Sequence, residues 1–154
     1  MYETELMVRA IGRVESPVQD TVDCDWGPVE SRIVLDPQYR PGLQGLDDFS
    51  HVVVVTYLHL AAFDAARHLV RRPRGLATMP ELGIFAQRAK DRPNPLGIPV
   101  VRLLGVASYG VTVQGLDAID GTPVLDLKPY FAEFDAAPGA RVPAWVQELM
   151  KGYF

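Results

Sequence analysis

The apolar run FSHVVVVTYLHL, residues 49–60, constrains the fold more than any other stretch of this sequence. Four consecutive valines favour a strand over a helix, because β-branched side chains lose rotamer freedom in a helix and fit a pleated sheet. The run is apolar at consecutive residues rather than at alternate ones, which is typical of a strand that is covered on both faces. We therefore expect one central strand that is buried on both faces.

Other segments of the chain also favour strands. In residues 29–35, the alternating side chains Val29, Ser31, Ile33 and Leu35 indicate a half-buried strand. Tyr109-Gly110 separates two apolar segments and predicts a tight hairpin between them. In full, the additional strands are expected within residues 6–14, 29–35, 82–87, 98–108 and 110–119. The Pro- and Gly-rich stretches 16–28 and 36–48 are predicted loops.

Only two short helices are predicted. In residues 61–70, Phe63, Ala66 and Val70 share one helical face and the arginines lie on the other. Residues 143–154 favour a terminal helix with Pro143 in its first turn. Strands dominate and long parallel crossovers are missing, so we expect a mainly β fold, an antiparallel barrel or sandwich with short helices. Without an internal repeat or a linker, residues 1–154 are expected to form a single domain.

Composition narrows the class of protein. No run approaches the roughly 18 apolar residues of a membrane span, and the N-terminus lacks the basic and apolar regions of a secretory signal. The single cysteine, Cys24, argues against an internal disulfide framework and a cysteine-rich zinc site. We therefore expect a cytoplasmic protein with no membrane partner.

The charge pattern is mixed. A formal net charge of −4 argues mildly against nonspecific binding to nucleic acid, which usually needs a basic surface. Local clusters can override the net sign, and for each of them the alternative is a solvated surface balanced by acids elsewhere. The two basic clusters are Arg67, His68, Arg71, Arg72 and Arg74, and Arg88, Lys90 and Arg92.

The loop GIFAQRAKDRPNPLGIPV, residues 83–100, combines three cations with three prolines. Proline fixes φ and keeps the preceding residue extended, so residues 92–95 should form a preset elbow. Asn94 lies between two prolines, where its amide can satisfy the turn backbone or face a ligand. Cations on a rigid elbow suit a phosphate, a carboxylate or the edge of a base. The alternative is a surface turn whose charges pair with nearby acids.

Residues 115–130 place Asp117, Asp120 and Asp126 within ten residues. Asp120-Gly121 is a hairpin signal, so Asp120 can also be only a turn former. Asp126 and Lys128 are two residues apart on a predicted strand, share one face and can form a structural pair. Three carboxylates can hold Mg²⁺, but nothing here resembles a dedicated metal loop. A carboxylate can also bind a ribose diol or attract a cationic ligand.

The two histidines that bracket the central run are weak evidence for a metal. His51 and His59 are eight residues apart, so on a regular strand they share a face. No third ligand lies nearby, which favours a satisfied core or rim histidine for His51. The sequence has no G-x-S-x-G elbow, phosphate-binding glycine loop or G-x-G-x-x-G fingerprint, so hydrolase, P-loop and Rossmann interpretations lack support.

Four segments in order resemble one family: AIGRVESPV, GLDDFSHVVVVTYLH, GIFAQRAKDRPNPLGIPVVRL and GLDAIDGTPVLDLKPY. Together they are similar to the TsaA-like, or TrmO-type, S-adenosylmethionine-dependent tRNA methyltransferases. The resemblance runs from about Ala10 to Tyr130. It implies a small antiparallel β-barrel with two or three short helices, a homodimer with the cofactor near the subunit interface, and N6-methylation of threonylcarbamoyladenosine next to the anticodon of tRNA.

The resemblance also implies roles for individual residues. Arg88 suits the carboxylate of S-adenosyl-L-methionine, the adenine needs an apolar slot, and the sulfonium favours carboxylate or aromatic neighbours. The expected cofactor-binding residues are His59, Leu60, Arg88, Ile98, Leu116, Asp117 and Asp120. Candidates for orienting the acceptor or for catalysis are Arg92, Asn94, Asp126, Lys128 and Tyr130, with Asp126 or Tyr130 as general base. Arg71, Arg72 and Arg74, on the predicted arginine-rich helix, would bind tRNA, and no metal is expected.

The sequence departs from the family pattern in three places. The loop has RAKD where Ser-Pro is common after the arginine, which keeps Arg88 and Arg92 in register. Some members carry a Pro-Arg-Gln stretch near the N-terminus, where Trp26 and Gly27 are the possible substitutes. Longer members add a C-terminal domain, which we do not expect here. Two alternatives stay open, a methyltransferase of this fold that acts on a small molecule and a non-catalytic module that binds the cofactor.

Overall fold

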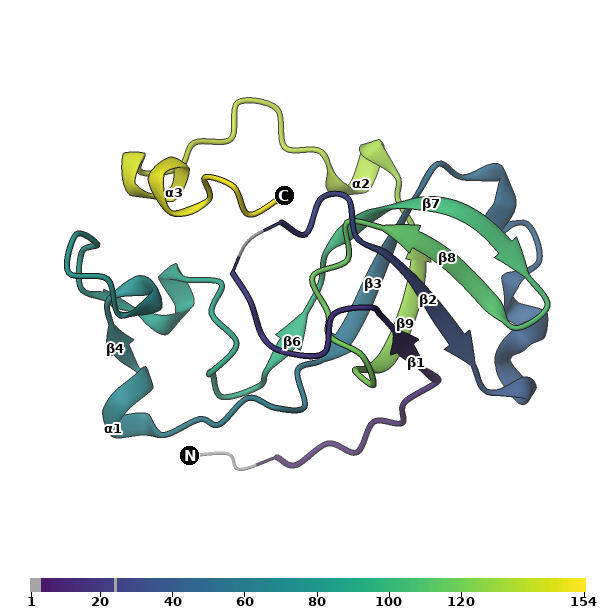
Figure 1. The fold of residues 1–154 in the computed structure, drawn as a ribbon, viewed down its shortest axis with the longest axis horizontal. Helices are drawn as coiled ribbons and strands as arrows, with labels where there is room; N and C mark the ends of the chain where they lie inside the picture. Colours follow the sequence, from purple (N-terminus) through teal and green to yellow (C-terminus); the bar gives the residue numbers. More distant parts are fainter. Residues whose placement is uncertain (1–3, 24) are drawn as a thin grey trace.

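Six antiparallel strands close into a barrel in the computed structural model, which describes residues 4–23 and 25–154 (Figure 1). Around the barrel the order is β3-β7-β8-β2-β1-β9, and β9 pairs again with β3 to close the sheet. This confirms the mainly β antiparallel barrel. The strands are β1 Gly12–Glu15, β2 Glu30–Leu35, β3 His51–Tyr57, β7 Val100–Ala107, β8 Gly110–Gln114 and β9 Pro123–Pro129. Cys24 lies outside the described residues.

The valine run forms the centre of the sheet, as predicted. β3 pairs with β9 along one edge, and along the other with β7 and the two-residue strand β6, Leu96–Gly97. Val52 and Val54 have no exposed surface and Val53 is 8% exposed, so both faces of the strand are covered. β2 shows the expected alternation, with Ser31, Ile33 and Leu35 buried.

The first predicted strand is wrong over most of its length. β1 covers only Gly12–Glu15, whereas Leu6 and Met7 are 83% and 90% exposed. The neighbouring strand β2 ends at Leu35, because Pro37 begins a 3-10 segment immediately afterwards. The last sheet-like bond on this side joins Asp36 N to Ile11 O, and residues before Ile11 have no continuing β2 partner to extend the strand.

The predicted arginine-rich helix over 61–70 is also wrong. The helix α1 covers only Ala65–His68, and the side chain that it buries is His68 rather than Phe63, Ala66 or Val70. Asp64 caps its start, and Val70–Arg71 immediately pair as β4 with β5, Leu82–Gly83. Arg71 is thus on a strand, and Arg74 lies in the 3-10 turn η3, Pro73–Gly75. The predicted strand 82–87 likewise stops at Gly83 and continues as the 3-10 turn η4, Ile84–Ala86.

The remaining elements are short. The hairpin between β7 and β8 turns at Ser108-Tyr109, one residue earlier than predicted, because Ala107 pairs with Gly110. Pro143 caps the terminal helix rather than lying in its first turn. These elements are η1 Pro37–Leu43, η2 Leu46–Asp48, α2 Ala132–Asp135 and α3 Ala144–Leu149. Among the described residues, no helix has the length and apolarity needed to cross a membrane.

Because every neighbouring pair in the barrel is antiparallel, successive connections alternate between its two ends. The loops 16–29, 58–99 and 115–122 all leave one end, which we call the long-loop end. The segment after α2 returns to this end, so that α3 lies on the same side of the barrel as α1 and β4 in Figure 1. The long-loop end therefore gathers side chains from four distant parts of the sequence.

Candidate functional site

Residues 88–95, which contain the predicted elbow at 92–95 and are called the elbow from here on, are joined by hydrogen bonds to the end of β3 at the long-loop end. Leu58 N donates to Pro95 O at 2.8 Å, and Ala62 N donates to the Asp91 carboxylate at 3.0 Å. Thr56 pairs with Gly97 on β6. The predicted residues His59 and Leu60 lie between Leu58 and Ala62, the two residues that these bonds join to the elbow.

Two charged side chains hold the elbow together, and only one was singled out from the sequence. Arg92 Nη1 donates to the carbonyls of Gln87 and Ala89 at 3.0 and 3.3 Å, so this guanidinium clamps the loop backbone. Asp91, which the sequence reasoning missed, pairs with Lys90 at 2.8 Å and lies 3.9 Å from Arg71. Burial raises the pKa of Asp91, but the hydrogen bonds from Lys90 and Ala62 outweigh it and leave the pKa below its ordinary value.

Three predicted cofactor residues are open to a ligand. Leu60 and Ile98 are 57% and 54% exposed, and Arg88 is exposed on the elbow. Leu116 differs, because its side chain has no exposed surface and belongs to the barrel core, which leaves only its backbone for binding. The site thus combines exposed apolar surface with a cation.

Asp117 lies close enough to Arg88 for the guanidinium to lower the carboxyl's pKa. Burial is the larger effect and raises the pKa of Asp117 overall, while a hydrogen bond from Tyr153 also opposes it. That hydrogen bond, from Tyr153 Oη to Asp117 Oδ2, measures 2.7 Å. Burial and the neighbouring Asp117 raise the pKa of Tyr153 as well. Sequence reasoning missed Tyr153, because nothing in a predicted terminal helix signals a contact with residue 117.

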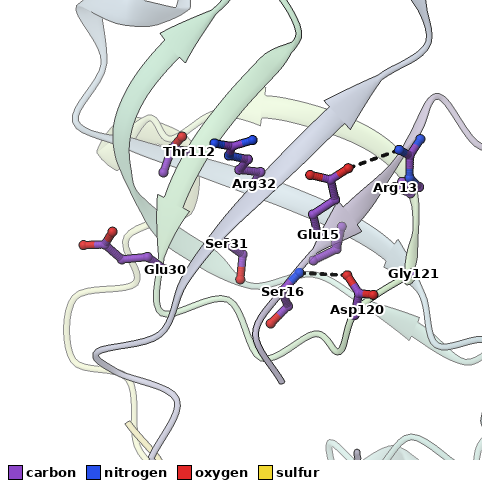
Figure 2. A pocket seen from close by; sticks show the side chains of 10 residues that line it. Arg13, Glu15, Ser16, Glu30, Ser31, Arg32, Thr112, Asp120 and Gly121 are labelled. Atoms are coloured by element: carbon purple, nitrogen blue, oxygen red, sulfur yellow. Dashed lines mark hydrogen bonds and ion pairs between the residues drawn. The ribbon is translucent and has the colours of Figure 1, made fainter. Parts of the chain in front are cut away.

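Asp120 belongs to a different place. Its carboxylate accepts from Ser16 N at 3.0 Å and lines a cavity of about 590 Å³ beside β1 and β2 (Figure 2). The predicted hairpin at Asp120-Gly121 is wrong, because β8 and β9 are not paired with one another. Asp120 and Gly121 instead form a turn in which Thr122 N donates to Ile119 O at 3.2 Å. Asp120 therefore joins the 16–29 loop to the 115–122 loop.

The arginines expected on a helix line one pocket despite the wrong secondary structure. This pocket of about 330 Å³, which we call the arginine pocket, is lined by Arg67, His68, Arg71, Arg72, Arg74 and Gly75. His68 Nδ1 accepts from Asp64 N at 2.8 Å, which leaves Nε2 to carry the ring proton. Arg72 donates to Met79 O, and Arg74 lies 3.9 Å from Asp23. The lining side chains are hydrogen-bond donors, an arrangement that suits an anion.

The possible substitutes for the Pro-Arg-Gln stretch have structural contacts. Trp26 is 2% exposed, and its indole Nε1 donates to Val22 O at 3.1 Å. A Cβ on Gly27 would come within 2.6 Å of the Phe154 carbonyl carbon, so glycine permits this close approach. Gly27 thus lies against Phe154, and Trp26 N also donates to Tyr153 O at 2.8 Å, so both residues contact the C-terminal residues.

Comparison with known proteins agrees with this geometry. Residues 13–136 match the sequence model of the tRNA-methyltransferase O N-terminal domain. The chain belongs to this family. A crystal structure of TrmO superposes with a TM-score of 0.74 at 30% identity, covering 92% of this chain and 62% of that one. TrmO from Pseudomonas aeruginosa gives a TM-score of 0.72 at 32% identity, over 90% and 62% of the two chains.

Curated relatives of the TrmO N-terminal domain carry two kinds of name. A "Probable S-adenosyl-L-methionine-binding protein" of Methanothermobacter thermautotrophicus is 38% identical over 88% of this chain and 98% of its own. The human "tRNA (adenine(37)-N6)-methyltransferase" is 35% identical over 75% of this chain, which spans only 25% of the human protein. The chain also spans less than two thirds of the solved TrmO chains.

The TrmO-type motif at 120–130 lies along β9. Asp126 Oδ2 and Lys128 Nζ are 2.7 Å apart, which confirms the predicted pair. Asp126 also accepts from Leu127 N, and its partnership raises the pKa of Lys128. Tyr130 N donates to His51 O at 3.1 Å, so Tyr130 lies at the start of β3.

Within one chain of this TrmO-type barrel, the predicted residues form two groups. β3 has seven residues, roughly 20 Å of strand, and it separates Tyr130 from the long-loop end that carries Arg88. His51 and His59 do not share a strand face, because β3 ends at Tyr57. His51 is an exposed rim residue bonded to Ser50 at 2.7 Å. No three described His, Cys, Asp or Glu side chains gather as a metal site requires.

Proposed function

We propose that this chain is an S-adenosylmethionine-dependent methyltransferase that N6-methylates threonylcarbamoyladenosine next to the anticodon of tRNA. Its membership of the tRNA-methyltransferase O N-terminal domain family supports this proposal, as do the names of its relatives. The observation that carries it is the long-loop end, where the charge of Arg88 acts on Asp117, Leu60 and Ile98 are exposed, and the 58–99 connection also carries the arginine pocket.

The residues at the long-loop end fit S-adenosylmethionine by their chemistry. Arg88 offers a guanidinium to a carboxylate, and Leu60 and Ile98 offer exposed apolar surface to an adenine. Asp117, as a carboxylate, attracts positive charge such as that of a sulfonium or an ammonium group. Asp120 and the Leu116 side chain do not contribute to this set, because their bonds and burial commit them elsewhere.

S-adenosylmethionine, when bound, supplies an electrophilic methyl group. The protein's part is to orient the acceptor nitrogen, to exclude water and to receive a proton, since methyl transfer depends mainly on positioning. Arg92 keeps the elbow that carries Arg88 in one conformation. Asp126 or Tyr130 receives the proton in this proposal, and Lys128 stabilises the Asp126 carboxylate. Asn94 is exposed on the elbow, where its amide can face the acceptor.

The arginine pocket is the proposed docking surface for tRNA. Changing Arg71, Arg72 and Arg74 together to Glu should lower tRNA affinity about 100-fold at low salt and flatten its salt dependence, because phosphate contacts release counterions. S-adenosylmethionine binding should stay near the wild-type value in Arg72→Glu alone, because Arg74 also packs on Tyr153 and Arg71 lies beside Asp91. The matched control changes Arg9, Arg102 and Arg141 to Glu. These three arginines are exposed and lie outside the pocket, and their substitution changes the net charge by the same amount. If both triple variants lose tRNA affinity equally, the pocket is not the docking surface.

The activity itself is tested by nucleoside mass spectrometry. tRNA that lacks this methylation is incubated with the protein and methyl-labelled S-adenosylmethionine, and we expect label on threonylcarbamoyladenosine. Label on another nucleoside would support a tRNA methyltransferase but would contradict threonylcarbamoyladenosine as its substrate. An Arg88→Ala variant serves as the control, because it should lose cofactor binding and label together.

Two observations favour other functions. Two relatives of which this chain covers 98% and 93% are named only for binding S-adenosylmethionine, which favours a non-catalytic binding module. The net charge of −4 favours a small-molecule acceptor over nucleic acid. Tight cofactor binding without label on any nucleoside would favour one of these two alternatives. Label on a small molecule from a metabolite pool would then favour the small-molecule methyltransferase over the non-catalytic binding module.

A homodimer is part of the proposal. The separation of the Arg88 group from Tyr130 along β3 supports it, because a second copy can bring its Tyr130 to the first copy's long-loop end. Light scattering measures the oligomeric state in solution, and a monomeric enzyme with full activity would overturn this part.

A further inference from the structure

The C-terminal residues lie outside the matched family range of 13–136 and yet return to the long-loop end. Asp25 N donates to Gly152 O at 2.9 Å, and Trp26 N donates to Tyr153 O at 2.8 Å. These backbone bonds are joined by the close packing of Gly27 against Phe154. The backbone on both sides of the Tyr153 side chain is therefore fixed.

The Tyr153 ring is held on more than one side. The Arg74 guanidinium lies 5.5 Å from its ring centroid, and the Phe154 ring meets it edge-on at 4.8 Å between centroids. Arg74 has φ 53°, a left-handed conformation that non-glycine residues rarely adopt, and this backbone brings its side chain towards Tyr153. With its ring so occupied, the group that Tyr153 offers to the site is its hydroxyl.

We propose that Tyr153 is a positioning residue of the cofactor site, whose hydroxyl holds the Asp117 carboxylate towards the positive charge of bound S-adenosylmethionine. The inference rests on the proposed function. It is carried by the 2.7 Å hydrogen bond between the two side chains and by the fixed backbone on either side of Tyr153. Without that hydroxyl, Asp117 would keep its place in the loop but lose the bond that orients it.

The charges around this pair give the proposal a specific signature. The charge of Arg88 acts on Asp117, while the charges of Asp23 and Arg74 act on Tyr153. Burial raises the pKa of Asp117, and the Tyr153 hydroxyl opposes that rise. Removing the hydroxyl should raise the pKa of Asp117 further, so Asp117 becomes neutral at a higher pH. Cofactor affinity should then fall off at a higher pH in the variant than in the wild type.

The test is S-adenosylmethionine binding by calorimetry between about pH 3.5 and pH 8, a range that includes the ordinary pKa of an aspartate. Tyr153→Phe should weaken binding about tenfold, the typical effect of losing a hydrogen bond to a charged group, and move the acid loss of affinity upwards. Tyr109→Phe is the matched control, because it removes a 3.0 Å hydroxyl bond to Thr112 elsewhere in the barrel. It should leave both affinity and pH profile unchanged.

A second variant separates positioning from general loosening. Asp117→Asn should bind weakly with no acid-dependent loss, and adding Tyr153→Phe to it should cause no further loss, because Tyr153 acts through the Asp117 charge. Wild-type affinity and pH profile in Tyr153→Phe, or additive losses in the double variant, would overturn the inference alone. Absence of S-adenosylmethionine binding by the wild-type protein would overturn the proposed function, and this inference with it.

Discussion

At the residue scale, backbone geometry decides which side chain a position accepts. Gly110 begins β8 with φ 152°, and a Cβ there would lie 1.9 Å from Ile33 O. No real side chain tolerates that distance, so β2 and β8 can pair here only if residue 110 is glycine. The requirement comes from a strand more than seventy residues away in sequence and not from the hairpin alone.

Gly110→Ala should therefore destabilise the barrel by at least about 2 kcal/mol, through strain and displacement of β2. Chemical denaturation measures the free energy of unfolding. Gly105→Ala is the control, because its Cβ would meet nothing within 4 Å. Equal effects of the two substitutions would contradict this explanation.

At the element scale, the short strands β4 and β5 depend on side-chain hydrogen bonds, because two residues form too few backbone hydrogen bonds to stabilise a strand pair. β4 and β5 have two residues each and carry Arg71 of the arginine pocket. Gln87, which is 6% exposed, donates to the carbonyls of Arg71 and Leu82 at 2.8 and 2.9 Å. The backbone carbonyl of Gln87 accepts from Arg92, so this residue joins the strand pair to the elbow through its side-chain NH2 group and its own backbone.

Gln87→Ala should cost roughly 2 kcal/mol, because two buried carbonyls lose a donor. It should also speed hydrogen exchange at residues 70–72 and 82–83. Denaturation and mass-spectrometric exchange report these two effects. Gln147→Ala, on the exposed face of α3, should change neither. Unchanged exchange in β4 and β5 would show that Gln87 does not hold the pair.

At the scale of the whole molecule, the barrel separates its two ends. The long-loop end carries Arg88 and Asp117, and the opposite end carries the hairpin at Ser108-Tyr109 and the segment that follows β9. In the homodimer that we propose, a site that used both Arg88 and Tyr130 would take one residue from each copy of the chain.

Mixing two inactive variants tests this arrangement. Arg88→Ala and Tyr130→Phe should each lose methyl transfer, and re-dimerised mixtures should regain about a quarter of wild-type activity, since one intact composite site forms in each mixed dimer. Mixing Arg88→Ala with Asp117→Asn is the control, because both residues lie at the same end of the barrel. No recovery in the first mixture would place the complete site within one chain.

Local patterns of residues predicted a mainly β antiparallel fold, the buried valine strand, the alternation in β2 and the Asp126–Lys128 pair, whereas the choice of a barrel over a sandwich came from the family resemblance. Each depends on local periodicity or on strand geometry, which neighbouring residues encode directly. The family motifs also identified Arg88, Asp117, Leu60 and Ile98, which the fold places at one end of the barrel. The arginines of the arginine pocket were found as a cluster in sequence but assigned to the wrong element.

The bounds of several elements and two of the site contacts depend on tertiary structure. The first strand covers only Gly12–Glu15, because its partner β2 ends at Leu35. The helix covers only Ala65–His68, because Val70 already pairs in β4. The tertiary structure also turned Asp120 towards Ser16 and brought Tyr153 to Asp117, contacts 104 and 36 residues apart in sequence. Such contacts depend on how the closed sheet brings distant loops to one end, and no local pattern of residues carries that information.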